Sequence, residues 1–288
     1  MADTGRTRHR AFRLALPSLV AASTLAAQAT QHTSVARQLY DQTSLRAVIN
    51  FSAGEVIVRP APSGMLYRMS ADYDAERYVP LTRYDSESQS VVLGLEPTGQ
   101  GGLRVSSKEH LEQAADIELS RMVPLTLDIT LGAAEGTLDL GGLRLRRVRL
   151  ETAGSRTAVR FAQVNPGRCD TLAVKSGAAE VSFESLGNSR CDAIQIDGGA
   201  GGVTLDLGGA WAADGRIGVA VAVGQVRLKI PRDLGVELSL EQFLSSFEPK
   251  GFVREGKVWR TPGYAQAGHR VALHLSTTVG GVNVAWVP

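Results

Sequence analysis

The feature that most limits how this chain can fold is a repeat of 22 or 23 residues in its second half. From Leu125 onward, apolar and polar residues alternate in short runs, which predicts half-buried strands. Small residues at the same spacing, Ser155, Gly177 and Gly199, predict a sharp corner in each unit, where Gly supplies a positive φ. Four mostly apolar columns keep the spacing over four units: Leu150, Leu172, Ile194 and Ile217; Thr152, Val174, Ile196 and Val219; Val159, Val181, Val203 and Val226; Phe161, Phe183, Leu205 and Leu228.

A single unit of this length has one apolar face, so it must stack on a neighbouring unit to bury that face. Stacking turns each column into a ladder whose equivalent residues lie about 4.8 Å apart in the hydrogen-bonding direction. A β-sandwich also has a strand about every 8–12 residues, but its geometry does not hold four columns at one spacing. The repeat therefore predicts an all-β protein, a β-helix or β-solenoid with rungs of about 22 residues.

Two cysteines, Cys169 and Cys191, lie one repeat apart, and each is preceded by Arg and followed by Asp. In a solenoid they occupy the same position on adjacent rungs. A rung spacing of about 4.8 Å falls within the Cα separation of a disulfide, roughly 4.4–6.8 Å, so we predict that they are bonded. The alternative is a ladder of two reduced thiols. No His lies near either Cys in sequence, and two thiolates do not complete a tetrahedral zinc site, so no metal site is predicted.

The two acids that follow these cysteines, Asp170 and Asp192, would also stack. Two like charges on adjacent rungs can raise the pKa of one carboxyl, as in a catalytic or cation-binding pair. The alternative interpretation is that both are solvated turn residues beside a disulfide. No third acid and no basic column accompanies them in the repeat, so we favour the turn residues and predict no catalytic residue.

The sequence holds none of the common short motifs of hydrolases or nucleotide-binding proteins. There is no Gly-x-Ser-x-Gly, no His-Glu-x-x-His, no Cys-x-x-Cys and no Gly-x-x-x-x-Gly-Lys followed by Ser or Thr. The glycine-rich stretch 198–202 falls on the predicted corner of the repeat and is not followed by a helical pattern. We therefore expect no cofactor.

The pattern divides the chain into segments. We expect a signal peptide at 1–29, an undecided N-terminal segment at 30–44, N-terminal β rungs at 45–97, a linker or insertion at 98–115, and the main solenoid at 116–288. Within the last segment, a cap excursion is expected at 237–270, near the C-terminal end.

The first 29 residues resemble an export signal in all three of its parts. Four arginines precede a 14-residue, largely apolar run, Leu14–Ala27, and Ala27-Gln28-Ala29 has the small-x-small pattern of a cleavage site. After removal of this segment the chain has 27 basic and 28 acidic residues, a net charge of −1, so nucleic acid is not an expected partner. No later apolar stretch is long enough to span a bilayer. We predict an exported protein that is periplasmic, cell-surface or extracellular.

Several stretches resemble the bacterial toast-rack family, which includes adhesin-like proteins and the C-terminal domain of cell-wall-active antibiotic response proteins. The resemblance lies in Leu125–Leu143, Ile230–Val236, Gly251-Phe252, Pro262–Tyr264 and Val279–Val284, the last taken as the final rung, and it covers about residues 45–288. The resemblance implies a right-handed β-helical fold and supplies no catalytic residues.

Two classes of function fit these observations. The first is a non-enzymatic structural, adhesin-like or interaction module of the cell envelope, whose partner is an envelope protein, a polymer or another copy of itself. The alternative is a carbohydrate-active β-helix enzyme that uses Asp170 and Asp192. The expected excursion is rich in aromatic residues, and these form the candidate binding surface: Phe243, Phe247, Phe252, Trp259 and Tyr264.

Overall fold

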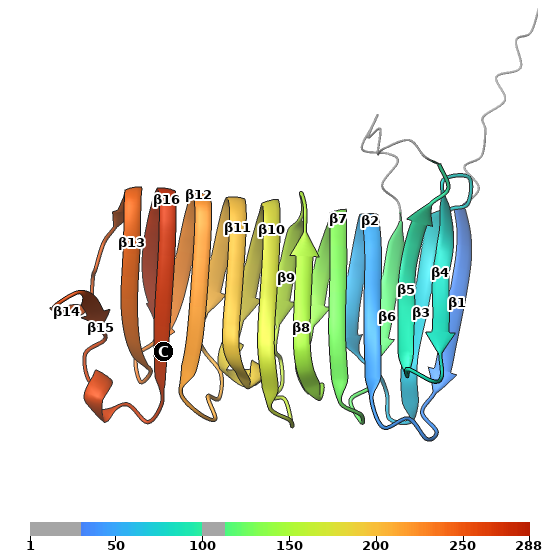
Figure 1. Ribbon diagram of the computed structural model, residues 1–288, viewed down its shortest axis with the longest axis horizontal. Helices are drawn as coiled ribbons and strands as arrows, with labels where there is room; N and C mark the ends of the chain where they lie inside the picture. Colours follow the sequence, from blue (N-terminus) through green and yellow to red (C-terminus); the bar gives the residue numbers. More distant parts are fainter. Residues whose placement is uncertain (1–29, 100–112) are drawn as a thin grey trace, which may run out of the picture.

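The computed structural model describes residues 30–99 and 113–288 and is all-β, as predicted (Figure 1). The predicted signal peptide and most of the predicted linker lie outside these residues. The strands are β1 (Thr30–Gln38), β2 (Leu45–Pro60), β3 (Met65–Asp74), β4 (Tyr78–Asp85), β5 (Ser90–Pro97), β6 (Ala114–Leu119), β7 (Leu125–Asp139), β8 (Leu145–Thr152), β9 (Arg156–Arg160), β10 (Cys169–Glu184), β11 (Cys191–Asp206), β12 (Gly215–Pro231), β13 (Gly235–Phe247), β14 (Val253–Glu255), β15 (Val258–Arg260) and β16 (Arg270–Val287). Short 3₁₀ helices are η2 (Leu186–Ser189) and η3 (Tyr264–Gln266). No helix among the described residues is long and apolar enough to cross a membrane.

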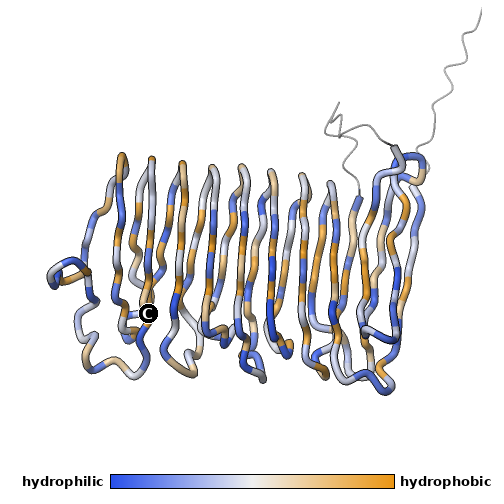
Figure 2. The backbone as a smooth tube through the Cα atoms, viewed as in Figure 1, coloured by the Kyte–Doolittle hydropathy of each residue, from blue (hydrophilic) through white to orange (hydrophobic). Residues whose placement is uncertain are grey.

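Most of the long strands bend near their middle, so that one strand contributes to both faces of a stack of coils (Figure 1). In β2, for example, residues 46–51 pair with β5 and residues 55–60 pair with β6. The coil between β7 and β10 is divided into β8 and β9, which each pair with both neighbours. Along the long strands of the stack buried and more exposed residues alternate, and the buried ones form one continuous core. Figure 2 shows the corresponding alternation of hydrophobic and hydrophilic residues along the backbone. The protein is therefore a β-solenoid of stacked parallel coils.

In three adjacent coils the bend has a glycine with a positive φ, but not one of those that the repeat indicated. Gly201, Gly224 and Gly280 have positive φ angles of 123°, 149° and 141° and lie side by side in adjacent coils. A Cβ on Gly224 would lie 1.7 Å from the carbonyl oxygen of Gly201, so only Gly fits. Gly177 and Gly199 lie in the same bends without a positive φ, which corrects the prediction.

The observed register confirms most of the predicted columns. Leu172, Ile194 and Ile217 are partners in adjacent coils, and so are Val181, Val203 and Val226. The coil formed by β8 and β9 is shifted by two residues relative to the predicted columns. Leu150 lies opposite Val174 rather than Leu172, and Val159 lies opposite Phe183 rather than Val181. Thr152 and Phe161 are displaced with them; Thr152 pairs with Ser176. A two-residue shift leaves every side chain on its original face, so the core remains intact.

The C-terminal strand does not form the final coil of the stack. β16 lies between β12 and β13 and runs parallel to both, so Ile217, Leu273 and Leu238 are neighbours in the core. The predicted final rung, Val279–Val284, is thus the last but one. Residues 237–247 of the expected cap excursion belong to β13, which forms the terminal coil, and only the β14–β15 hairpin and η3 depart from the stack.

The other end of the solenoid is covered by antiparallel strands. β4 pairs with β5, β3 pairs with β6, and β1 pairs with β3, so residues 30–38 of the undecided segment form the outermost strand. Ala114 and Ala115, placed in the linker by the sequence analysis, are part of β6.

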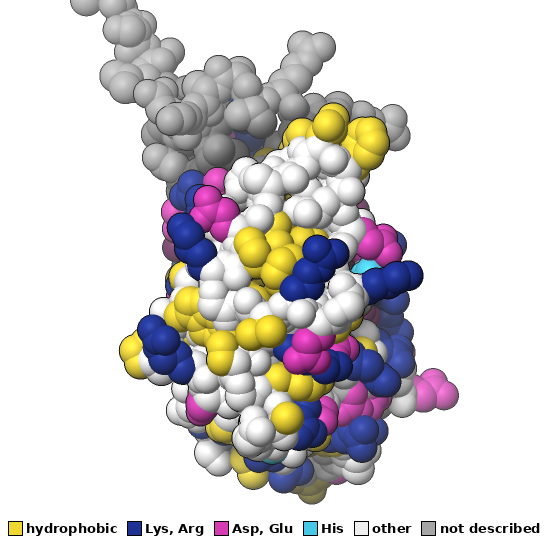
Figure 3. Space-filling view, turned by 90° about the vertical axis from the view of Figure 1, so that its left-hand side faces the viewer, with side chains coloured by type: hydrophobic (Ala, Val, Ile, Leu, Met, Phe, Trp, Pro, Cys, Tyr) yellow, Lys and Arg dark blue, Asp and Glu magenta, His cyan; other side chains and the backbone are white. Residues whose placement is uncertain are grey.

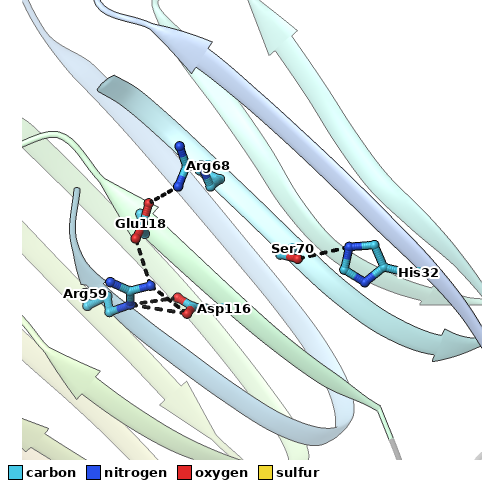
Figure 4. A network of polar contacts seen from close by, with 6 residues as sticks. All are labelled: His32, Arg59, Arg68, Ser70, Asp116 and Glu118. Carbon is cyan, nitrogen blue, oxygen red and sulfur yellow. Dashed lines mark hydrogen bonds and ion pairs between the residues drawn. The ribbon is translucent and has the colours of Figure 1, made fainter. Parts of the chain in front are cut away.

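An ion-pair network joins these antiparallel strands to the parallel stack (Figure 4). The Glu118 carboxylate on β6 is almost fully buried and lies 2.8 Å from Arg59 on β2 and 3.3 Å from Arg68 on β3. Arg59 also donates to Asp116, and this hydrogen bond is the main reason that the Arg59 pKa is raised above its ordinary value. Because a buried carboxylate needs charged partners, the network fixes how β3 and β6 meet β2.

Candidate binding surfaces

The two cysteines lie opposite each other in β10 and β11, and they form the predicted disulfide. Their Cα atoms are 4.2 Å apart, and both side chains are buried in the core. The bond closes a loop of 22 residues, which in the chain-entropy model stabilises the fold by about 3 kcal/mol. The pair is therefore a brace between two neighbouring coils.

The two acids beside the disulfide do not form an isolated carboxylate pair. The Asp192 carboxylate accepts hydrogen bonds from Arg168 at 2.7 and 2.9 Å, so its charge is balanced by an arginine of the adjacent coil. Asp170 is exposed at the edge of β10. Among the described residues, no group of three or more His, Cys, Asp or Glu side chains is arranged to hold a metal ion.

The aromatic residues predicted as a binding surface divide into three environments. Phe247, Phe252 and Trp259 are partly buried and pack together, with ring centroids 6.4 Å apart for Phe247 and Phe252 and 5.7 Å apart for Phe247 and Trp259. Trp286 on β16 completes this aromatic cap, 5.6 Å from Phe252, and its indole N–H donates to the Lys250 carbonyl. The aromatic cap covers one part of the open end of the core.

Tyr264 lies on η3, outside the aromatic cap, between two arginines. The guanidinium groups of Arg260 and Arg270 are 4.9 and 5.7 Å from the centre of its ring. Arg260 also pairs with Glu237 and Glu255, and the hydrogen bond to Glu237 is the first cause of its raised pKa. These contacts attach η3 and the β14–β15 hairpin to the terminal coil.

Phe243 is the exposed member of the set. It lies at the bend of β13 with 76% of its surface accessible, and its neighbour Leu244 is 65% accessible. Leu244 aligns with Val279 and Val223 of the next two coils, which are also exposed, so apolar side chains continue along the bend. Figure 3 views the molecule from this end, where hydrophobic side chains gather between charged ones.

The backbone of this part of β13 has a free edge. Within the described residues, β13 pairs with β16 on one side and with β15 on the other, but β15 covers only Glu237–Ser239. Residues 240–247 therefore leave backbone N–H and C=O groups available for a partner. We define the terminal edge as residues 240–247 of β13.

Sequence reasoning missed Leu244 and Trp286. Leu244 follows Phe243 directly, and this apolar pair within a polar stretch was a usable signal. Trp286 lies in the final strand, and its contact with Phe252 could not be inferred without the position of β16.

Comparisons with known proteins agree with this architecture. A family model described as the N-terminal domain of toast_rack matches residues 25–181, which is more than half of the chain. A second model, described as the C-terminal part of the cell wall-active antibiotics response protein LiaF, matches residues 184–284. None of the curated proteins matches the chain.

The chain is also similar to solved structures at low sequence identity. One is described as a "putative cell adhesion protein" from Clostridium sporogenes, with 14% identity, a TM-score of 0.48, and coverage of 90% of this chain and 100% of that one. Another is a "putative adhesin" from Bacteroides fragilis, with 13% identity, a TM-score of 0.41, and coverage of 88% and 97%. The match of the first family model over residues 25–181, with the stacked coils described above, shows that the chain belongs to the toast-rack family.

Proposed function

We propose that this protein is an exported, non-enzymatic interaction module of the cell envelope that binds its partner through the terminal edge. The observation that carries the proposal is the difference between the two ends. In the described residues each end finishes in an edge strand, but β1 carries His32 and Arg37 and exposes no large hydrophobic side chain, whereas β13 exposes Phe243 and Leu244. Natural β proteins protect exposed edges with charge, yet residues 242–247 carry none, which favours an edge that a partner covers.

Export is the second element of the proposal. The disulfide between Cys169 and Cys191 supports it, because such bonds persist mainly in oxidising compartments. The signal-like segment at 1–29 supports it independently. We further propose that the coils are right-handed, with rungs of about 22 residues. Partner residues in β10 and β11 are 22 positions apart, as in Cys169 and Cys191, and those in β11 and β12 are 23 apart, as in Ile194 and Ile217.

The alternative, a carbohydrate-cleaving enzyme, has less support. Catalysis of that kind needs two carboxyl groups free to act on one substrate. Here Asp192 is paired with Arg168, and Asp170 is exposed to solvent at the start of β10.

Cosedimentation with isolated envelope fragments tests the binding proposal. The full chain should be retained, and the double variant Phe243→Ser with Leu244→Ser should lose about tenfold in affinity, on the order of 1.4 kcal/mol. Val79→Ser is the matched control, because Val79 is 46% exposed on β4 at the opposite end. Equal retention of the double variant and the wild type would show that the terminal edge is not the binding surface.

Activity assays on a panel of polysaccharides test the enzymatic alternative. We expect no cleavage by the wild type. If the wild type cleaves a glycan and the double variant Asp170→Asn with Asp192→Asn does not, the two acids are catalytic and the proposal of a binding module is wrong.

A further inference from the structure

A cavity of about 290 Å³ lies among the turns that precede β10, β11 and β12. These turns lie along the lower edge of the solenoid in Figure 1. Its walls include one aromatic residue, Trp211, and four charged ones, Arg168, Arg190, Asp192 and Asp214. We call it the Trp211 pocket. Three other depressions on the solenoid, lined mainly by strand and bend residues, have no aromatic wall.

Hydrogen bonds between three successive turns hold the Trp211 pocket in shape. The Asn188 side chain donates to the Phe161 carbonyl at 2.9 Å and accepts from the Ala210 N–H at 2.8 Å. The Asn188 carbonyl accepts from Asn165, and the Gly187 N–H donates to Gly208, both at 2.9 Å. Cys191, which also lines the pocket, is fixed by the disulfide. A site held in this way loses little conformational entropy when a ligand binds.

Backbone strain is concentrated in the same wall. Ser185 and Arg190 bracket η2 with φ angles of 56° and 53°, in the left-handed region that non-glycine residues avoid. Among the described residues only Gln89 shares this property. Such strain persists only where the surroundings impose it, and it is found more often at ligand sites than elsewhere.

The chemistry of the walls points to a particular kind of ligand. The Trp211 ring lies directly against the backbone, since a Cβ on Gly187 or Gly215 would come within 2.8 or 2.4 Å of it. Its indole N–H is already used by the Leu207 carbonyl, so the ring supplies only apolar surface. The two arginines and two aspartates balance in charge. Arg168 and Asp192 are hydrogen-bonded to each other, and Asp214 Oδ1 accepts from the Arg270 N–H, so the outer nitrogens of the two guanidinium groups and Asp214 Oδ2 are the donors and acceptor for a ligand.

We propose that the Trp211 pocket binds a pyranose ring of a neutral saccharide, with the apolar C–H face of the sugar against Trp211 and its hydroxyl groups on the arginines and aspartates. A saccharide combines an apolar face, many hydroxyl groups and no net charge. The volume lies near the lower limit of ligand pockets, roughly 300 Å³, which suits one sugar ring rather than a folded partner. This site is separate from the terminal edge and does not depend on it.

Fluorescence titration of the full chain with maltose, cellobiose and N,N′-diacetylchitobiose tests the proposal. At least one disaccharide should give a saturable change at millimolar concentration, and Trp211→Ala should weaken binding by about tenfold or more. Binding of the corresponding polymers, amylose, cellulose and chitin, distinguishes a free oligosaccharide from the end of a polysaccharide.

Matched variants keep the test decisive. Tyr40→Ala removes an aromatic residue that is 92% exposed and outside the pocket, and it should bind as the wild type does. Arg190→Ala should weaken binding without removing Trp211, and thermal melting identifies any variant that fails to fold. The double variant of Phe243 and Leu244 should bind saccharide normally. Failure of all three disaccharides to bind, tighter binding of glucose 6-phosphate, or binding unaffected by Trp211→Ala and Arg190→Ala would overturn the proposal.

Discussion

At the scale of single residues, the solenoid places neighbouring positions of one strand in opposite environments. Val203 is 3% exposed and lies between Val181 and Val226 of the adjacent coils. The next residue, Thr204, is partly exposed on the other face and lies between Ser182 and Arg227. A charged side chain at position 203 would be buried without water or an oppositely charged neighbour, whereas one at position 204 would reach both solvent and Arg227.

We therefore expect Val203→Asp to lower the free energy of unfolding by about 3 kcal/mol or more, and Thr204→Asp to change it by about 0.5 kcal/mol or less. Urea denaturation of both variants, followed by circular dichroism, measures the difference. Similar midpoints for the two variants would show that the assigned faces of β11 are wrong.

A second test compares two glycines that both have a positive φ, Gly224 at the bend of β12 and Gly256 in the turn between β14 and β15. Gly224→Ala places a Cβ against the Gly201 carbonyl oxygen, and combined strain and overpacking should cost about 3 kcal/mol. Gly256→Ala, at φ 64° with no atom nearby, should cost only the backbone term of about 1 kcal/mol. Thermal melting compares them, and equal losses would mean that close approach of the coils plays no part.

At the scale of elements, the position of β16 makes two other strands depend on it. β12 and β13 each have β16 as a neighbour, and neither pairs with the other in the described residues. Removal of residues 270–288 should therefore expose β12 and detach β13, while β2 and β7 remain paired.

Hydrogen exchange of backbone amides measures whether β13 depends on β16. In the truncated chain, amides of β13 should lose their protection and those of β7 should keep it. Deletion of residues 30–38 is the control, because among the described strands β1 pairs only with β3 and lies at the outer edge. Retained protection of β13 after loss of β16 would contradict the dependence.

The sequence was sufficient for the fold class, for the disulfide and for most of the core, because stacking forces equivalent residues to recur at one spacing. It was insufficient for the order of the last coils. A repeat reveals that Val279 and Val282 occupy the same columns as Val223 and Val226, but any position along the stack satisfies that pattern. The two-residue shift of Leu150 escaped detection for a similar reason, since its side chain faces the core in either register.

The candidate binding surfaces were less predictable than the core. Phe243 and Trp259 look alike in sequence, yet one is exposed and the other is packed in the aromatic cap, and contacts with Phe247 decide between them. Trp211 stands alone in a turn of small residues, and its pocket is formed when the turn between β10 and β11, with Gly187 and Arg190, is brought beside it.

At the scale of the whole molecule, the charge balance and the compartment depend on the first 29 residues. We expect the exported form to begin at Thr30, the first residue of β1. Mass spectrometry of the protein from the periplasm or medium checks the new N-terminus. Recovery of a chain that retains Met1 from a cytoplasmic fraction would show that no export signal is cleaved.

The place of β16 also governs how the molecule can be assembled. A chain synthesised from its N-terminus delivers β13 before β16, so β13 cannot pair with its neighbour in the stack until β16 has followed. We therefore expect coil-by-coil growth to pause at β12, and the coils of β16 and β13 to form together. Until the final 18-residue strand is released, β12 carries a long unpaired edge that the β16 of another copy fits equally well. At high concentration we therefore expect folding chains to exchange their β16 strands, which would yield interlocked dimers in place of independent solenoids.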